Sequence, residues 1–251
     1  IAENNASQNT GSGIKIQNSN DNIVVRNNAN LNKDGIYLNV SNNNTLAANN
    51  ARENDDFGIR IELSKYNVIT ENYAQNNNNT GIDIEESSEN ILKRNIMSGN
   101  DYDLEAAGDN DIDASNRIDG KAVYYLVGAT NITIDSSSDA AGIVYCLNCS
   151  NITIKDQNFE NNSFGVRLYN TTDSRIEMNR FKNKNRIELL EISSNNTITN
   201  NTLEENLDIG IKLSDADGNT ISRNLIINGE VNGIRLDDSH NNTLAENNVR
   251  E

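Results

Sequence analysis

Isoleucine and leucine alternate with polar residues in short stretches along the whole chain, as in Gly35-Ile-Tyr-Leu and Gly233-Ile-Arg-Leu. Alternation over a few residues is the period of a half-buried β-strand, not that of a helix. The glycine that opens these stretches recurs, mostly at spacings of 22 or 23 residues, at Gly13, Gly35, Gly58, Gly81, Gly142, Gly165, Gly210 and Gly233. A fixed period of this length indicates a repeat architecture with one structural unit per repeat.

Polar residues keep a fixed distance from these glycines. A serine follows six positions later at Ser19, Ser41, Ser64, Ser87 and Ser239. Asparagines follow nine positions later at Asn22, Asn44, Asn67, Asn90, Asn151, Asn219 and Asn242, and fourteen positions later at Asn27, Asn49, Asn72, Asn95, Asn179, Asn224 and Asn247. An inward asparagine at a turn can bond the asparagine one coil away, which satisfies buried polar groups. The spacing therefore predicts ladders of stacked serine and asparagine side chains.

These patterns predict an all-β, right-handed parallel β-helix of about eleven coils, with equivalent residues stacked at about 4.8 Å. The register blurs between Asn100 and Ala141, where Asp103-Leu104 replaces the glycine of one coil. We expect a first half at residues 1–116 and a second at 117–251. The two would form one continuous solenoid with a junction near 114–131.

Composition narrows the function classes. The chain has a net charge of -16, no proline and 35% hydrophobic residues, which suits an elongated repeat better than a solid globular core. The strict register of Ile, Leu and Gly argues against disorder. The acidic balance argues against nucleic acid as a partner, because phosphate backbones require clustered Lys and Arg. No apolar run is long enough for a membrane span.

The two ends of the sequence lie inside repeats. Residues Ile1–Ala6 align with Leu46–Ala51 and with Leu244–Val249. Uncapped solenoid ends expose strand edges. The expectation is that the native protein continues into further coils, or that like subunits stack end to end. The start at Ile1 instead of Met suggests a processed or truncated product whose signal segment is not in this sequence.

The register GI-x-[IL]-x2-S-x2-N-x-[IL]-x2-N resembles the NosD-like, CASH-type β-helix repeats of the pectin-lyase-like superfold, common in archaeal and bacterial surface proteins. The segment Ile118-Asp119-Gly120-Lys121 is similar to the family's IDGKPVYYL segment, with Ala122 in place of proline. The resemblance covers nearly the whole chain and implies the β-helix fold. Members include carbohydrate-binding modules, polysaccharide enzymes, surface structural proteins and a periplasmic factor associated with copper-enzyme maturation. A copper role needs soft ligands, and one His, two Met and two Cys are too sparse for a convincing site.

The outward positions of the glycine-led strands carry the main functional candidates. Two and four positions after the glycines, charged and aromatic residues form two columns along one sheet, the face on which pectin-lyase-like relatives hold polysaccharide. The candidate glycan face consists of Tyr37, Arg60, Glu62, Asp83, Glu85, Arg167, Tyr169, Lys212 and Arg235, with Tyr145 as a further aromatic candidate. The alternative is a self-complementary charged face that keeps the sheet soluble.

Catalysis would need two carboxylates poised as acid and base or nucleophile. Glu62 and Glu85 fall on adjacent coils, near the roughly 5 Å separation of retaining glycosidases, and Asp237 is a third candidate. Any two stacked acids would do the same, and no lyase or polygalacturonase cluster is recognisable. The sequence thus favours an extracellular, non-catalytic module, structural or adhesive at the cell surface. A polysaccharide lyase or glycosidase and a cation-dependent binding module are the alternatives.

Two further groups could carry chemistry. Asp109, Asp111 and Asp113 alternate as hard-cation ligands can, so calcium is the one cofactor that the sequence suggests, although Ala114 and Gly120 depart from an EF-hand loop. Cys146 and Cys149 form the single C-x-x-C. Packing at a coil corner, a disulfide and a metal site stay open for this pair.

Exposed and inward positions carry further expectations. Among many N-x-S/T matches, the candidates for glycosylation are the turn positions Asn39, Asn78, Asn161 and Asn170. Glycosylation would suit a secreted protein. The expected partners of such a protein are polysaccharide or like subunits. Replacing inward Asn67 by Leu should cost on the order of 1 to 3 kcal/mol. Replacing outward Arg60 by Gln should cost little. His240, the sole histidine, is expected at the surface.

Overall fold

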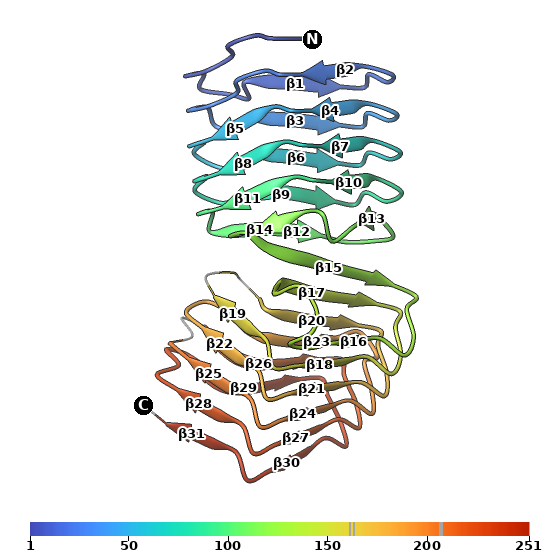
Figure 1. The fold of residues 1–251 in the computed structure, drawn as a ribbon, viewed down its shortest axis with the longest axis vertical. Coiled ribbons are helices and arrows are strands. Elements are labelled where there is room, and N and C mark those ends of the chain that lie inside the picture. Colours follow the sequence, from blue (N-terminus) through green and yellow to red (C-terminus); the bar gives the residue numbers. More distant parts are fainter. Residues whose placement is uncertain (161, 163, 206–207, 251) are drawn as a thin grey trace. The chain divides into compact units, whose positions relative to one another are not determined.

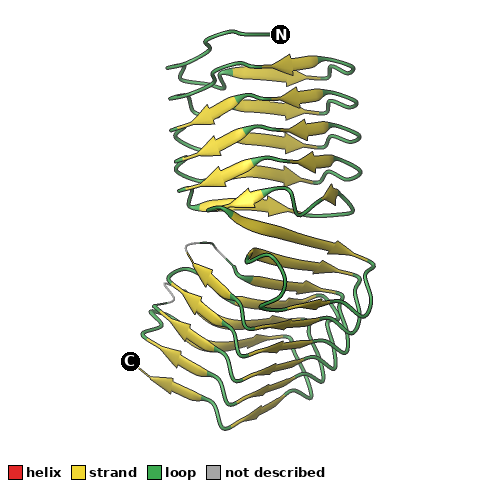
Figure 2. Cartoon of the chain, in the orientation of Figure 1, coloured by secondary structure: helices red, strands yellow, loops and turns green. Residues whose placement is uncertain are grey.

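The structure is a computed structural model that describes residues 1–160, 162, 164–205 and 208–250. Every regular element in these residues is a β-strand (Figure 2). The strands pair in parallel between successive coils (Figure 1), which confirms the predicted all-β parallel β-helix of about eleven coils with asparagine ladders. The chain divides into two compact units, Ile1–Val123 (unit 1) and Tyr124–Glu251 (unit 2). This division lies within the stretch 114–131.

Unit 1 winds through three parallel sheets. The first contains β1 (Ile14–Gln17), β3 (Ile36–Asn39), β6 (Ile59–Glu62), β9 (Thr80–Glu85) and β12 (Tyr102–Ala106). The second contains β2 (Ile23–Val25), β4 (Thr45–Ala47), β7 (Val68–Thr70), β10 (Ile91–Lys93) and β13 (Asp111–Ile112). The third contains β5 (Asn50–Arg52), β8 (Tyr73–Gln75), β11 (Ile96–Ser98) and β14 (Arg117–Ile118).

Unit 2 repeats this plan. Its first sheet contains β17 (Ala141–Leu147), β20 (Val166–Tyr169), β23 (Ile187–Leu190), β26 (Ile209–Ser214) and β29 (Asn232–Asp237). Its second contains β16 (Thr133–Ile134), β18 (Thr153–Lys155), β21 (Arg175–Glu177), β24 (Thr197–Thr199), β27 (Thr220–Ser222) and β30 (Thr243–Ala245). Its third contains β19 (Asn158–Glu160), β22 (Arg180–Lys182), β25 (Thr202–Glu204), β28 (Leu225–Ile227) and β31 (Asn248–Arg250).

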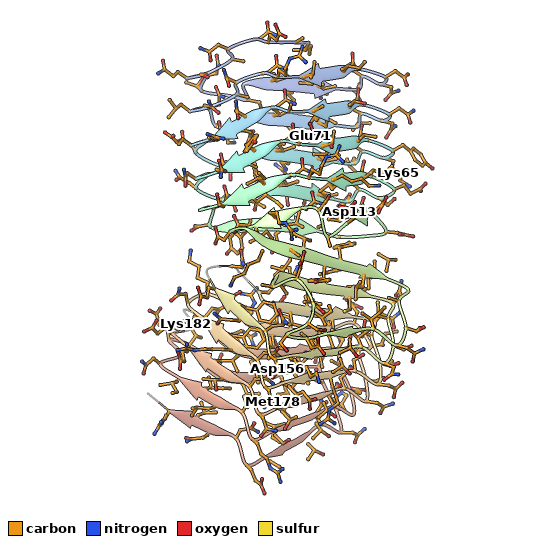
Figure 3. All side chains as sticks on the ribbon, viewed as in Figure 1. Lys65, Glu71, Asp113, Asp156, Met178 and Lys182 are labelled. Atoms are coloured by element: carbon orange, nitrogen blue, oxygen red, sulfur yellow. The ribbon has the colours of Figure 1, made fainter. Side chains whose placement is uncertain are left out.

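Alternation along each strand sends one set of side chains inward and the other outward. In β6 the inward Ile59 and Ile61 are fully buried, whereas Arg60 and Glu62 are half-buried on the outer face. The side chains of turn residues such as Lys65 and Glu71 are exposed at the surface of unit 1 (Figure 3). The apolar residues fill the coil interior because only that face of each strand is shielded from water.

The predicted ladders are present. The backbone N–H and the side-chain amide of Asn67 both donate to Oδ1 of Asn90, each at 3.0 Å. Ser41 N–H donates to Oγ of Ser64 at 2.9 Å, as the serine column predicts. Unit 1 also has an asparagine ladder that was not predicted, which consists of Asn9, Asn32, Asn54, Asn77 and Asn100. These bonds satisfy the polar groups buried at the coil corners.

The prediction is wrong for one ladder residue. Asn151 is exposed with φ 53°, and the N–H of the buried Ile152 donates to Oγ of Ser174 instead. The reason is a shift of one residue in β17, where Val144 pairs with Val166. The residue equivalent to Gly165 is therefore Ile143, not Gly142.

The Asp119-Gly120 turn closes a hairpin at the end of unit 1. Ile118 pairs antiparallel with Lys121, the first residue of β15 (Lys121–Val127). Asp119 and Gly120 have φ of 48° and 80°. A two-residue hairpin loop of type I′ needs positive φ at both positions, and Asp-Gly is one of the pairs that adopt it most readily.

Candidate functional site

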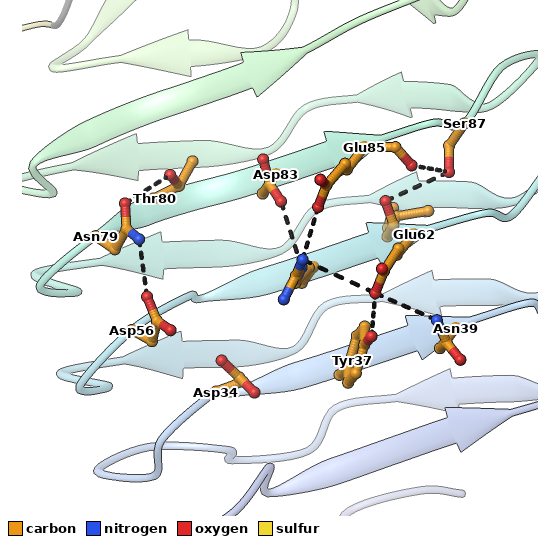
Figure 4. Close-up of polar contacts among 12 residues, drawn as sticks. Asp34, Tyr37, Asn39, Asp56, Glu62, Asn79, Thr80, Asp83, Glu85 and Ser87 are labelled. Atoms are coloured by element: carbon orange, nitrogen blue, oxygen red, sulfur yellow. Dashed lines mark hydrogen bonds and ion pairs between the residues drawn. The ribbon is translucent and has the colours of Figure 1, made fainter.

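The candidate site is a strand-face cluster on the outer side of the first sheet of unit 1, formed by Tyr37 of β3, Arg60 and Glu62 of β6, and Asp83 and Glu85 of β9 (Figure 4). Strand pairing sets Tyr37 beside Arg60 and Arg60 beside Asp83, and it sets Glu62 beside Glu85. The sequence predicted all five residues for this face. Strict parallel register brings them together.

Arg60 is the centre of the strand-face cluster. Its Nη2 lies 2.6 Å from Glu85 Oε2 and 3.8 Å from Glu62 Oε2, and its Nε lies 3.6 Å from Asp83 Oδ2. The guanidinium carbon also lies 4.9 Å from the ring centroid of Phe57 and 5.5 Å from that of Tyr37. A cation held over aromatic rings and paired with carboxylates has a fixed position.

Tyr37 is tied to the next coil through its phenol, which donates a hydrogen bond to Glu62. The same carboxylate accepts a hydrogen bond from the side-chain amide of Asn39 at 3.2 Å. Burial and the hydrogen bond to Glu62 raise the pKa of Tyr37 to about 12. The phenol is therefore a donor across the neutral pH range, with part of its ring on the outer face.

Asp83 is the acid whose protonation is most altered in the strand-face cluster. Burial raises its pKa to about 7, the charge of Arg60 lowers it in part, and the charges of Glu85, Glu105 and Glu62 raise it again. A carboxyl group that is part-protonated at neutral pH can donate or accept a proton. The side chain is 15% exposed, so it can be reached from outside.

The strand-face cluster combines features that polyhydroxylated ligands use. Glu62 and Glu85 offer acceptor oxygens for hydroxyl groups, and Tyr37 offers a ring edge and a phenolic oxygen that can accept a hydrogen bond while its proton is donated to Glu62. Lys15 extends it by one coil, with Nζ at 5.1 Å from the Tyr37 ring centroid. Phe57 was not among the predicted site residues, because it precedes Gly58 at a corner and follows no strand alternation.

The unit 2 part of the predicted glycan face is organised differently. Arg167 pairs in register with Glu188, and Glu188 pairs with Lys212, which pairs with Arg235. Arg167 Nε lies 2.6 Å from Glu188, and the guanidinium lies 3.9 Å from the centroid of the Phe164 ring. Burial by itself would raise the pKa of Glu188. The charges and hydrogen bonds of Arg167 and Arg186 outweigh this effect, so the pKa is lowered below its usual value.

Glu188 was missed from the sequence because its coil has no glycine. Val166 pairs with Ile187, so Arg186 occupies the position of Gly165. Glu188 is 2% exposed and lies between two arginines, which makes this group a buried ion-pair network. Tyr169 is half-buried at the end of β20, and Tyr145 is buried and stacked on Tyr125 at 4.8 Å, so Tyr145 is wrong as a ligand-stacking candidate.

The remaining carboxylate candidates do not join the strand-face cluster. Asp237 lies in unit 2, where Arg235 pairs with it at 2.9 Å. Asp111 is 3.4 Å from Lys93, and Asp113 accepts a hydrogen bond from Ser115. Among the described residues no group of three or more His, Cys, Asp or Glu side chains could hold a metal ion. The structure thus does not gather Asp109, Asp111 and Asp113 into a calcium site.

The predicted surface positions differ in exposure. Asn78 and His240 are exposed, and Asn39 and Asn170 are half-buried. The side-chain amide of Asn39 already donates to Glu62, and that of Asn170 donates to Asn148 at 2.7 Å. Asn161 lies outside the described residues. Asn78 is the position whose side chain is most available for a glycan.

Fold and site together define a parallel β-helix protein with a charged and aromatic strand face. More particularly, the chain belongs to the NosD family: the family model described as "Periplasmic copper-binding protein (NosD)" matches residues 1–118 and 105–251. No curated protein matches the chain in sequence.

Three solved structures are similar in fold. The A-module of the mannuronan C-5 epimerase AlgE6 from Azotobacter vinelandii is 15% identical with a TM-score of 0.38, over 92% of this chain and 65% of that one. A DFA-IIIase from Arthrobacter chlorophenolicus A6 is 11% identical with a TM-score of 0.31, over 84% and 56%. PfbA, a surface adhesin of Streptococcus pneumoniae, is 10% identical with a TM-score of 0.33, over 91% and 72%. The chain therefore spans less than two thirds of the first two structures.

The copper named in the family description does not fit the donors of this chain. Met97 is buried in unit 1, and Met178, 51% exposed (Figure 3), lies in unit 2. His240 is exposed, and the two cysteines are buried with no third soft ligand gathered beside them among the described residues. Copper sites need several soft or imidazole donors in one shell. The soft donors of this chain are too dispersed to form such a shell.

No helix in the described part of the chain is long and apolar enough to cross a membrane.

Proposed function

We propose that the chain is a non-catalytic β-helix module outside the cytoplasm, structural or adhesive at the cell surface, that binds polysaccharide along the first sheet of unit 1. The strand-face cluster carries this proposal. It supplies carboxylate and phenolic oxygens as acceptors, and an aromatic ring, on a face whose strands are fixed by the coil core. A rigid face of this kind loses little entropy on binding. The periplasmic description of the family supports a location outside the cytoplasm.

Binding would follow the strand stack. Tyr37, Arg60 and Asp83 occupy successive coils in one column, and Asn39, Glu62 and Glu85 occupy the neighbouring column. Because the coils repeat at about 4.8 Å, the face offers regularly spaced polar groups to a linear polymer. Side chains already held by ion pairs and rings need little reorganisation. Stacking of like subunits end to end stays a prediction.

A glycan array probed with the full chain tests the proposal, and affinities would then be measured for the glycans retained. Tyr37→Ala should weaken binding at least about tenfold, because the ring and the phenol are both lost. Tyr66→Ala is the matched control, since Tyr66 is 53% exposed at a turn of unit 1 outside the strand-face cluster. Equal affinities of the wild type and Tyr37→Ala would contradict binding at this face.

A polysaccharide-active enzyme is the second candidate, and the raised pKa of Asp83 beside Glu62 and Glu85 favours it. Reducing-sugar release and the ultraviolet absorbance of unsaturated products would be followed with each bound glycan. Turnover that disappears in Glu62→Gln or Glu85→Gln would replace the non-catalytic proposal. Binding with no turnover at any pH between 4 and 9 would support it.

A further inference from the structure

The two cysteines of the chain occupy two different columns of the same coil of unit 2. Cys146 is an inward residue of β17 and pairs with Leu168 of β20. Leu189, Leu213 and Leu236 continue that column. Cys149 follows at the corner after β17, and its N–H donates to Oγ1 of Thr171 at 3.3 Å.

The Cys149 column otherwise holds small residues, mostly with hydroxyl groups. Thr171 N–H donates to Oγ of Ser193, and Ala216 N–H donates to Oγ of Ser239, both at 3.1 Å. The Cys149 thiol imitates these hydroxyls, because it approaches the carbonyl oxygens of Leu126 and Leu147 at 3.3 and 3.4 Å. A serine would serve this position equally well.

A leucine would likewise serve the position of Cys146, as it does in the next coils. Packing explains each cysteine alone, but it does not explain why both columns change in the same coil. The property that the two side chains share is a thiol group, and two thiols can be oxidised to a disulfide. Both side chains are buried, and the two residues lie three positions apart in the chain, at the end of β17 and at the corner that follows it.

We propose that Cys146 and Cys149 form an intramolecular disulfide that closes the corner after β17. This modification is independent of the proposed glycan binding. Both residues are free thiols in the structure, which is then the reduced form of the pair.

The two thiols perturb one another in the reduced form. The pKa of Cys149 is lowered to about 7, with the Cys146 thiol as the first cause, and the pKa of Cys146 is raised well above its usual value by Cys149 and by burial. The thiolate is the nucleophile in disulfide exchange, and either cysteine can attack first once the coil is open.

The reaction balances as thiol–disulfide exchange with a small-molecule or protein disulfide as oxidant. One of the two cysteines attacks a sulfur of the oxidant as its thiolate, breaks the S–S bond and releases one thiolate. The other cysteine then loses its proton, attacks the protein sulfur of the mixed disulfide and releases the second thiolate. The chain loses two protons and two electrons, and the oxidant becomes two thiols. Because Cys146 is 0% and Cys149 3% exposed, the exchange takes place before the coil closes or when it opens.

The test is to refold the reduced full chain with oxidised glutathione, then to denature it, alkylate it and weigh it. We expect a monomer about 2 Da lighter than the reduced chain, with no alkylated cysteine until a reductant is added. Two alkylated cysteines without reductant would overturn the proposal, and so would disulfide-linked dimers as the main product.

Two variants restore residues that other coils use at these positions and so serve as matched controls for folding. Cys146→Leu keeps Cys149, and Cys149→Ser keeps Cys146. Neither variant can form the intramolecular disulfide, so after the same refolding neither should show the loss of about 2 Da, and each should present a single alkylatable cysteine once a reductant is added. A loss of about 2 Da in either variant would show that the mass change of the wild-type chain does not report a bond between Cys146 and Cys149. If either variant does not fold, the mass of the wild-type chain still decides whether the disulfide forms.

Discussion

Nη2 of Arg60 in β6 lies 2.6 Å from Oε2 of Glu85 in β9, so one side chain joins two coils of unit 1. Tyr37 joins a third coil, since its phenol bonds Glu62 and its ring lies beside the Arg60 guanidinium. Charge pairs between neighbouring strands usually contribute less than about 1 kcal/mol each. In the strand-face cluster one cation serves three carboxylates and two rings, so its removal leaves several groups without a partner.

Arg60→Gln should therefore destabilise unit 1 by on the order of 1 to 2 kcal/mol, through lost ring contacts and through repulsion among Glu62, Asp83 and Glu85. This value replaces the sequence-based expectation of little cost, which treated Arg60 as a solitary outward charge. Urea denaturation at low and high salt measures it, and the loss should shrink as salt screens the acids. Arg26→Gln is the control, because its pair with Glu3 is largely exposed. Equal losses in both variants would refute the special position of Arg60.

A second prediction concerns pH. Burial is the main cause that raises the pKa of Asp83 and of Asp103 to about 7 from the usual 3.8. Between these values the folded chain holds protons that the unfolded chain has released, so stability falls as pH rises. The contribution is complete below pH 3.8 and is lost as pH passes about 7. Each pKa unit corresponds to about 1.4 kcal/mol.

Asp83→Asn and Asp103→Asn should each remove part of this slope, and the gain in stability over the wild type should be larger at pH 8 than at pH 4.5. Differences from the wild type are the useful measure, because groups such as Glu188, with a lowered pKa, give the opposite slope. Asp111→Asn is the control at an exposed position beside Lys93. Parallel pH curves for Asp83→Asn and the wild type would show that Asp83 is an ordinary acid.

The fold could be predicted from the sequence because the strand alternation and the repeat of 22 or 23 residues occur together along the chain. Alternation placed Ile59 and Ile61 inside, and the spacing from glycine to asparagine placed Asn67 in a ladder. The ladder through Asn54 and Asn77 was missed because these residues precede the glycine of the next coil, beyond the reach of the two asparagine spacings. Asn151 was wrongly placed in a ladder because the glycine of its coil, Gly142, is shifted by one residue. Glu188 was missed because Arg186 replaces the glycine of its coil.

The site was only partly predictable for a related reason. Strand register follows from sequence spacing, so the five residues of the strand-face cluster could be named. Contacts that cross a corner depend on backbone geometry that spacing does not encode, as with Phe57 beneath Arg60. Burial of an outward residue is equally hidden, since Tyr145 occupies an outward position of β17 but is covered by Tyr125 and Phe164.

A third prediction tests the ladders. Asn67→Leu should cost on the order of 1 to 3 kcal/mol, because the N–H of Asn44 and the side-chain amide of Asn44 both lose their acceptor inside the coil. Asn78→Leu is the matched control at an exposed asparagine in unit 1 and should stay within about 0.5 kcal/mol. Denaturant unfolding of both variants measures the difference. Similar losses at the two positions would mean that the inward amides add no more stability than surface ones.

The last prediction concerns Gly165, which borders the aromatic stack inside unit 2. The rings of Phe159 and Phe181 stack with centroids 4.8 Å apart, and a Cβ at position 165 would lie 2.7 Å from atoms of both rings. Its φ is not in the left-handed region, so the need for glycine here is one of space and not of backbone conformation. Gly165→Ala should thus force the buried rings apart and destabilise unit 2 by about 1 to 3 kcal/mol. Gly11→Ala, where a Cβ meets nothing within 4 Å, is the control and should change stability by less than about 1 kcal/mol. Thermal unfolding followed by near-ultraviolet circular dichroism reports both the loss of stability and the movement of the rings. An unchanged melting curve for Gly165→Ala would show that the stack yields without cost, and the close approach would then not be the reason for glycine at this position.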